Sequence, residues 1–284
     1  MRSKRICFIL ICLFLTYNDL YAQRQKAIEP AILECLYEHT MLNDTLNPKS
    51  LILDRMILRI GKTMSQFFSQ DTFYGDSLWN DPQGKFIAHD LTMKAVRSHN
   101  MAAKPGVKTT SDYIYKKSSQ GEISTYTTLV TTGITFKEKV EDFQWMLIDS
   151  VKANCGYDCR LAKTDFRGRS YFVWFAPDLP ISDGPWKFSG LPGLILEVYD
   201  SKDHYHYTIV SIRSTNLLPV SFYNFWEYKY EKTERKKYLR GLWKAFTDTH
   251  PMRTLKASTG IDLGTDEGRV INPMNRDFLE RDYR

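Results

Sequence analysis

Two histidines in the second half of the chain have a spacing that suits metal binding. His204 and His206 are two residues apart, and on a β-strand this spacing places both imidazoles on one face. Two ligands do not complete a metal site, and the sequence singles out no third ligand. The alternative is an exposed hairpin whose polar side chains point outward. His204 and His206 are therefore either a partial metal site or the polar face of a hairpin.

Two arginines form a second candidate site. Arg167 and Arg169 flank Gly168, and guanidinium groups so placed can bind a carboxylate or a phosphate. The same three residues also suit a strand kink or bulge in which the arginines pair with acids of the chain itself. We favour the structural interpretation and keep both arginines as candidates for ligand binding.

Aromatic residues gather close to these arginines in the sequence. Trp174 and Trp186 stand near Tyr171, Phe175 and Phe188. Such a group can stack a sugar or hold an acyl chain, or it can fill the core of a β-layer. Because aromatic side chains dominate core burial, we expect this group to form part of the hydrophobic core, and we keep Trp174 and Trp186 as candidate ligand contacts.

Other catalytic patterns are missing from the sequence. It contains no G-x-S-x-G elbow, no H-E-x-x-H helix motif and no G-x-x-x-x-G-K phosphate loop. The net charge of +6 is mild, and the basic run Arg235-Lys236-Lys237 lies among acids, which argues against nucleic acid as a partner. We therefore predict no cofactor and no assigned catalytic residue.

The N-terminus has the pattern of a secretory signal peptide. The basic start at residues 1–5 precedes an apolar run from Ile6 to Leu15, and Ala22 suits cleavage before Gln23. That run is too short to span a bilayer, and we expect no transmembrane segment after cleavage. The sequence thus predicts a signal peptide at residues 1–22 and a periplasmic, cell-surface or secreted protein.

Export bears on the cysteines left after cleavage. Cys35, Cys155 and Cys159 would meet an oxidising compartment, where a disulfide is possible. If Gly156 turns the chain, Cys155 and Cys159 can pair locally, and Cys35 can pair with either. Buried free thiols are the alternative.

The elements that position these residues are mostly strands. Aromatics make up 14% of the chain, which favours β-structure. Apolar runs and alternation predict strands at residues 31–37, 51–60, 64–69, 161–166 and 171–175, and hairpins at 113–128 and 194–212. A short helix is expected at 91–101, and an apolar stripe predicts one clear helix at 226–249.

One motif lies at the centre of this pattern. In Leu191-Pro192-Gly193-Leu194 proline pre-sets the second turn position, and we expect positive φ at Gly193, as in a type II turn. A buried strand should follow from Leu194. The motif consists of Gly190, Leu191, Pro192, Gly193, Leu194 and Ile195.

This hexapeptide, together with Gly184–Phe188 and Phe166–Arg169, resembles the GLPGLI family of exported Bacteroidetes proteins. The resemblance implies an uncharacterised, mostly β envelope protein. It also suggests likeness to the bowl-shaped β domain of a bacterial peptide-N-glycosidase and to half-barrel lipoprotein chaperones.

We therefore predict a mainly β fold, a single antiparallel curved sheet or incomplete, bowl-like barrel with one C-terminal helix. Residues 23–250 should form the domain, and 251–284 an extended tail. The hollow of such a sheet needs filling by the helix, by aromatic core or by a ligand. The expected function is non-enzymatic binding of an unknown envelope ligand or protein partner, or a structural accessory role. The alternative is an envelope hydrolase or metal-dependent enzyme using His204 and His206.

Overall fold

The computed structural model describes residues 25–117, 120–139, 143–261 and 277–283, so the predicted signal peptide lies outside the described residues. The described chain is mainly β, as expected. Its strands are β1 (Gln25–Glu29), β2 (Ala31–Leu42), β3 (Leu51–Gly61), β4 (Met64–Ser69), β5 (Tyr113–Lys117), β6 (Glu122–Leu129), β7 (Thr132–Lys139), β8 (Met146–Asn154), β9 (Tyr157–Phe166), β10 (Arg169–Ala176), β11 (Leu194–Asp200), β12 (Tyr205–Arg213), β13 (Val220–Tyr223) and β14 (Glu231–Lys232). The α-helices are α2 (Gln70–Trp79), α3 (Gly84–Arg97), α4 (Arg235–Phe246) and α5 (Pro251–Thr259).

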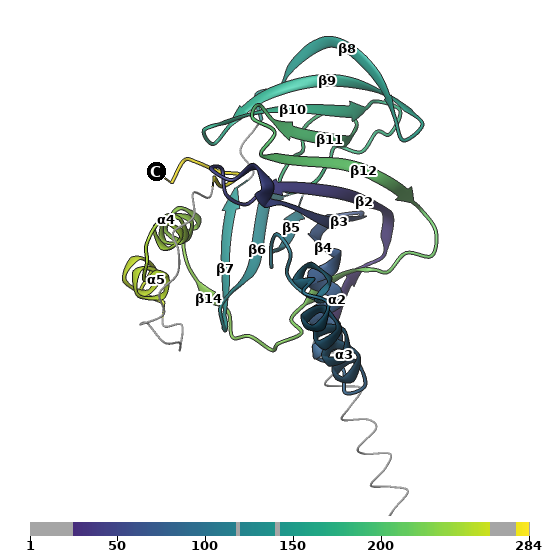
Figure 1. Cartoon of the computed structure of the whole chain (residues 1–284). Helices are drawn as coiled ribbons and strands as arrows, with labels where there is room; N and C mark the ends of the chain where they lie inside the picture. The colour runs from purple at the N-terminus through teal and green to yellow at the C-terminus, as the bar shows by residue number, and fades with distance from the viewer. Residues whose placement is uncertain (1–24, 118–119, 140–142, 262–276, 284) are drawn as a thin grey trace, which may run out of the picture.

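Twelve of these strands form one strongly curved sheet (Figure 1). Their order is β14-β7-β6-β5-β4-β3-β2-β12-β11-β10-β9-β8, and the two end strands, β14 and β8, do not pair, so the sheet stays open. Neighbouring strands of this sheet are antiparallel, except β14 and β7, which are parallel. The prediction of a single sheet is wrong, because β1 and β13 pair separately as a small second sheet.

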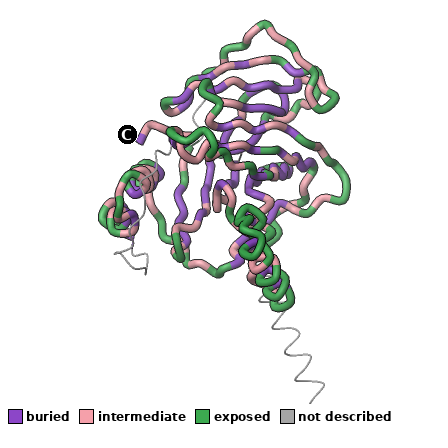
Figure 2. Tube along the Cα trace, in the orientation of Figure 1, coloured by how far each residue is buried: buried purple, intermediate pink, exposed green. Residues whose placement is uncertain are grey.

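A long connection occupies part of the hollow that the curved sheet creates. Lys116 on β5 donates to the Gly184 carbonyl oxygen at 2.6 Å, although four strands separate β5 from β11 in the sheet order. Phe188 of this connection is fully buried. The 177–193 connection therefore crosses the hollow of the sheet, and its buried side chains form part of the hydrophobic core. The strands around it also carry long buried stretches (Figure 2).

The hexapeptide needs glycine for a different reason from the predicted one. Gly193 does not have positive φ, whereas Gly190 does, at +91°. A Cβ at Gly193 would lie only 2.7 Å from the Ala176 carbonyl carbon and closer still to its oxygen. The predicted type II turn is thus wrong, and close backbone packing at the β10–β11 junction is what requires glycine. The buried strand from Leu194 is confirmed.

The helices differ from the single C-terminal helix that we predicted. α4 starts at Arg235 because the preceding residues run extended and add β14 to the sheet edge. Its apolar stripe is confirmed, since Tyr238 and Ala245 pack with Ile134 and Phe136 of β7. α5 replaces the first part of the predicted extended tail. None of the described helices is long and apolar enough to cross a bilayer.

Two more helices lie between β4 and β5. α2 begins after Ser69, whose hydroxyl caps it by accepting from the Thr72 backbone N–H at 3.1 Å. α3 starts earlier than the predicted 91–101 helix, at Gly84. The two helices contact each other and extend away from the sheet (Figure 1).

Candidate functional site

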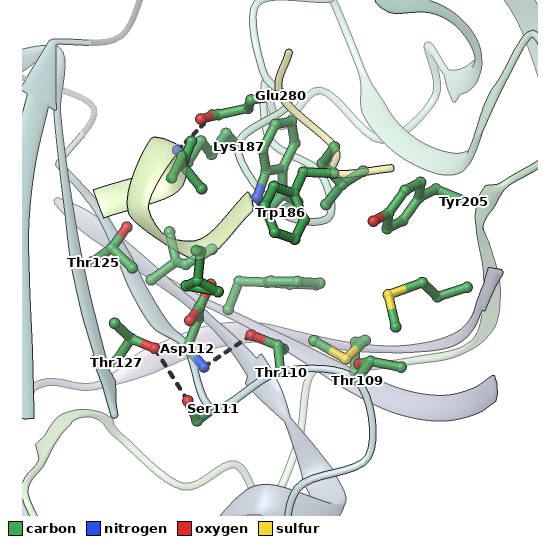
Figure 3. Close-up of a pocket in the computed structure, with 18 of the residues that line it drawn as sticks. Thr109, Thr110, Ser111, Asp112, Thr125, Thr127, Trp186, Lys187, Tyr205 and Glu280 are labelled. Carbon is green, nitrogen blue, oxygen red and sulfur yellow. Dashed lines mark hydrogen bonds and ion pairs between the residues drawn. The ribbon is translucent and has the colours of Figure 1, made fainter. Parts of the chain in front are cut away.

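The part of the hollow that the 177–193 connection leaves open is a cavity of about 300 Å³. Its walls come from β2 to β7, from β12, from Trp186 and Lys187 of the connection, from the segment before β5, from helix α4 and from residues 278–280 (Figure 3). Most lining side chains are apolar, including Met41, Met56 and Phe67 from the sheet and Leu242 from α4. The volume lies at the lower end of the range for small-molecule sites. The hollow of the sheet is thus filled in part by helix α4 and the aromatic core, and in part it remains open as a cavity.

One side of the cavity is polar. It is built by the segment that leads into β5, which carries Thr109, Thr110, Ser111 and Asp112, and by the facing residues of β6 (Figure 3). The Asp112 backbone N–H donates to the Thr110 hydroxyl at 3.0 Å, and the Ser111 and Thr127 hydroxyls lie 3.1 Å apart. These bonds fix a row of hydroxyl groups beside one carboxyl group.

Asp112 is the acid on the polar side of the cavity. Burial raises the pKa of its carboxyl above the ordinary value. The hydroxyls of Thr127 and Thr110 and the charge of Lys187 favour the ionised form, but they do not outweigh burial. A carboxyl with a raised pKa in a cavity is a recognised mark of a functional position.

His39 borders the same cavity and is neutral. Burial lowers its pKa to about 4, against the effect of its backbone hydrogen bond. Its ring stacks on Tyr207 with centroids 4.0 Å apart, and Nδ1 lies 3.0 Å from the His206 carbonyl oxygen. Because a carbonyl oxygen only accepts, Nδ1 carries the proton and Nε2 is left as an acceptor.

The C-terminal segment 277–283 supplies residues 278–280 of the cavity wall and is held in place by buried ion pairs. Glu280 lies 2.5 Å from Arg167, 2.7 Å from Lys187 and 2.5 Å from Arg235. Glu138 contacts the same three cations. Burial opposes ionisation of Glu280, yet the three cations lower its pKa below the ordinary value. Residues 277–283 of the predicted extended tail contain no helix or strand, and these ion pairs dock them against the rest of the chain.

The two predicted arginines serve this docking. The side chain of Arg169 lies 2.5 Å from Asp200 and donates to the Phe278 carbonyl at 2.7 Å. Arg167 and Gly168 have φ of +48° and +81°, and they form the two-residue turn of the β9–β10 hairpin where we expected a kink or bulge. Both guanidinium groups are buried against acids of the chain itself, as the structural alternative held.

The two predicted tryptophans separate. Trp174 and Trp186 are both buried in the main core. Only Trp186 also lines the cavity (Figure 3). Trp174 instead lies under the Lys152 ammonium, 4.5 Å from the ring centroid.

The two predicted histidines bind different carboxylates. His204 Nδ1 lies 3.1 Å from Asp277, and His206 Nε2 lies 3.1 Å from Glu197. His206 Nδ1 lies 3.2 Å from Asp203, so both of its ring nitrogens face acids. The hydrogen bond to Glu197 raises its pKa. Within the described residues no cluster of three or more His, Cys, Asp or Glu side chains is arranged to hold a metal ion.

The cysteines do not pair in the structure. Cys35, Cys155 and Cys159 are free thiols, the first and last of them buried. Cys155 and Gly156 do form the expected turn, with φ of +51° and +82°. Burial raises the pKa of Cys35 to about 12 and that of Cys159 to about 11, so both are protonated at neutral pH.

The fold and site define a mainly β protein with a ligand-sized cavity in the hollow of an open curved sheet. Residues 114–197 are similar to a family described as "Protein of unknown function (Porph_ging)". The matched residues include the hexapeptide Gly190–Ile195, but the family has a different name from the GLPGLI family that the hexapeptide resembles. No curated protein matches the chain.

Among solved structures, two crystal forms of PNGF-II are similar. The form in space group P21 has 11% sequence identity and a TM-score of 0.48 over 75% of this chain. The form in space group C2 has 11% identity and a TM-score of 0.46 over 73%. The chain spans about a third of the length of those proteins, 33% and 32% respectively.

Proposed function

We propose that this is an exported, non-enzymatic binding protein that holds a small amphipathic ligand in the cavity between the sheet, α4 and residues 278–280. The observation that carries the proposal is the cavity itself, about 300 Å³ with a largely apolar lining and one polar side. Tightly packed interiors rarely leave such a volume open, and ligand sites combine apolar walls with a few placed polar groups.

The polar groups of this cavity suit recognition. The described lining residues include no serine or cysteine paired with a base, and burial lowers the pKa of His39 to about 4, which makes it a weak base at neutral pH. The hydroxyl row and Asp112 offer hydrogen bonds that orient a bound molecule. Export is supported by the N-terminal sequence pattern, with its basic start, apolar run and Ala22.

A neutral fluorescent probe tests the proposal. N-phenyl-1-naphthylamine should bind the wild type with saturable fluorescence enhancement. Leu242→Trp places an indole from α4 into the cavity and should abolish this binding. Lys244→Trp adds the same side chain at an exposed position of the same helix and should leave binding unchanged. Equal binding by Leu242→Trp and wild type, with both folded by circular dichroism, would refute the proposed site.

A further inference from the structure

We infer that the cavity recognises a ligand whose apolar body ends in a protonated primary amine, with Asp112 as the group that pairs with the ammonium. This inference rests on the proposed function, because it names the chemistry of the molecule bound at the same site.

The balance of charge on the cavity wall points to a cation. Lys187 and Glu280 both line the cavity, but they bind each other at 2.7 Å within the buried ion cluster. His39 is neutral. Among the described lining residues, Asp112 is the acid without an ion pair. The hydroxyls of Thr127 and Thr110 hydrogen-bond the Asp112 carboxyl but carry no charge, and a ligand ammonium is a partner that compensates the charge of the ionised form.

The same balance argues against an anionic ligand. The cation on the wall, Lys187, is already bound by Glu280 and Glu138. A fatty acid or a phosphate would therefore meet Asp112 without gaining an unpaired cation among the described lining residues. Like charges brought together in a dry cavity repel strongly, because the effective dielectric there is low.

Hydroxyl groups beside Asp112 can accept the remaining ammonium protons. An ammonium has three donors, and a carboxylate oxygen uses one of them. Thr125 and Thr127 are two residues apart on β6, so their side chains share a face. The Thr125 hydroxyl is buried, lines the cavity and has no hydrogen-bond partner in the protein (Figure 3). A buried unpaired hydroxyl is uncommon, and a bound donor would satisfy it.

Aromatic faces complete the surrounding. The rings of Trp186, Tyr205 and Tyr238 also line the cavity. Lys187 already lies over the Trp186 ring and Arg169 over the Tyr205 ring, so these rings serve to accept the apolar body of the ligand. The carboxyl and hydroxyl groups suit the ammonium, and the rings suit the apolar body of an amphipathic amine.

A matched series of ligands tests the head group alone. Octylamine, octanol and octanoate share one tail and differ in charge. Each is titrated at pH 7 against the full chain loaded with N-phenyl-1-naphthylamine. Octylamine should displace the probe at a concentration about tenfold lower than octanol, and octanoate should be weakest. Asp112→Asn should remove the difference between octylamine and octanol.

The control is Asp178→Asn, which makes the same charge change at an exposed position and should keep the preference for the amine. Displacement by octanol or octanoate at concentrations equal to or below that of octylamine overturns the inference. So does an amine preference that survives Asp112→Asn. If the probe binds but no head group is preferred, only the amine inference fails. If the probe does not bind the wild type, the proposed function fails, and the inference falls with it.

Discussion

Replacing Glu280 by glutamine should destabilise the protein strongly, because it removes one carboxylate from a buried cluster. Arg167, Lys187 and Arg235 each contact Glu280 within 2.7 Å, and the Glu280 side chain is 4% exposed. Removing one partner from a buried pair costs about 3–5 kcal/mol, since the remaining charges stay desolvated. Glu138 still contacts all three cations, so we expect the lower end, about 3 kcal/mol.

Urea unfolding at pH 7 measures this loss, followed by circular dichroism for wild type and Glu280→Gln. The matched control is Glu122→Gln. Glu122 also pairs with a lysine, Lys137 at 2.9 Å, but the lysine is 59% exposed and the glutamate 29%. Surface pairs contribute little, so this control should change the unfolding free energy by less than about 1 kcal/mol. Equal small losses for both variants would refute the view that the ion cluster holds the C-terminal wall in place.

Three further predictions concern the hollow and its walls. Gly193→Ala should lower the free energy of unfolding by about 3 kcal/mol or more, because its Cβ would clash with the Ala176 backbone. Gly121→Ala has open space around its Cβ but a positive φ, and should lower it by about 1–2 kcal/mol. Thermal unfolding of the two variants and the wild type measures both losses. Because burial depresses the pKa of His39, its contribution to the free energy of unfolding is complete above pH 6.5, and about 3 kcal/mol of that free energy is lost as the pH falls to 4. In a pH series of urea unfolding, His39→Phe should flatten the decline of stability between pH 6.5 and pH 4. Asp112→Asn should raise the unfolding free energy at pH 7, because burial disfavours the wild-type carboxylate, and the gain should vanish at acidic pH, where the carboxyl is protonated in both the folded and the unfolded chain. A gain that stays unchanged at low pH in the urea series would contradict the raised pKa of Asp112.

Strands with strong apolar patterns were predictable from the sequence. The hairpin of β11 and β12 follows from alternation around a polar turn, and β2, β3 and β4 from their apolar runs. The short strands β1, β13 and β14 were not, because their pairing depends on partners far along the chain. α2 escaped prediction for a different reason. It buries only Thr72 and Gly75, so it has almost no apolar face to recognise.

The candidate site was harder to predict than the fold. The aromatic group near the hexapeptide pointed to the right part of the chain, and Trp186 does line the cavity. Asp112 gave no signal, because a single acid in a run of hydroxyl residues is typical of a loop. Asp112 is buried by segments that are far apart in the sequence, from His39 on β2 to Glu280 near the C-terminus. Such burial follows from tertiary packing and from no local pattern.

The hexapeptide shows how a correct location can carry a wrong reason. Its glycine suggested a turn with positive φ, and the structure instead places the chain so close to Ala176 that a side chain does not fit. The positive φ belongs to Gly190, three residues earlier. Sequence types restrict the backbone, but only packing decides which restriction applies at a given glycine.

The most direct test of the binding role is native mass spectrometry of the protein purified without detergent from its own cells. We predict a reproducible adduct of small-molecule mass on the wild type. We also predict its absence from Leu242→Trp and its presence on Lys244→Trp. Wild-type protein that is consistently free of any adduct, or an adduct that persists on Leu242→Trp, would contradict the account of the cavity as a ligand site.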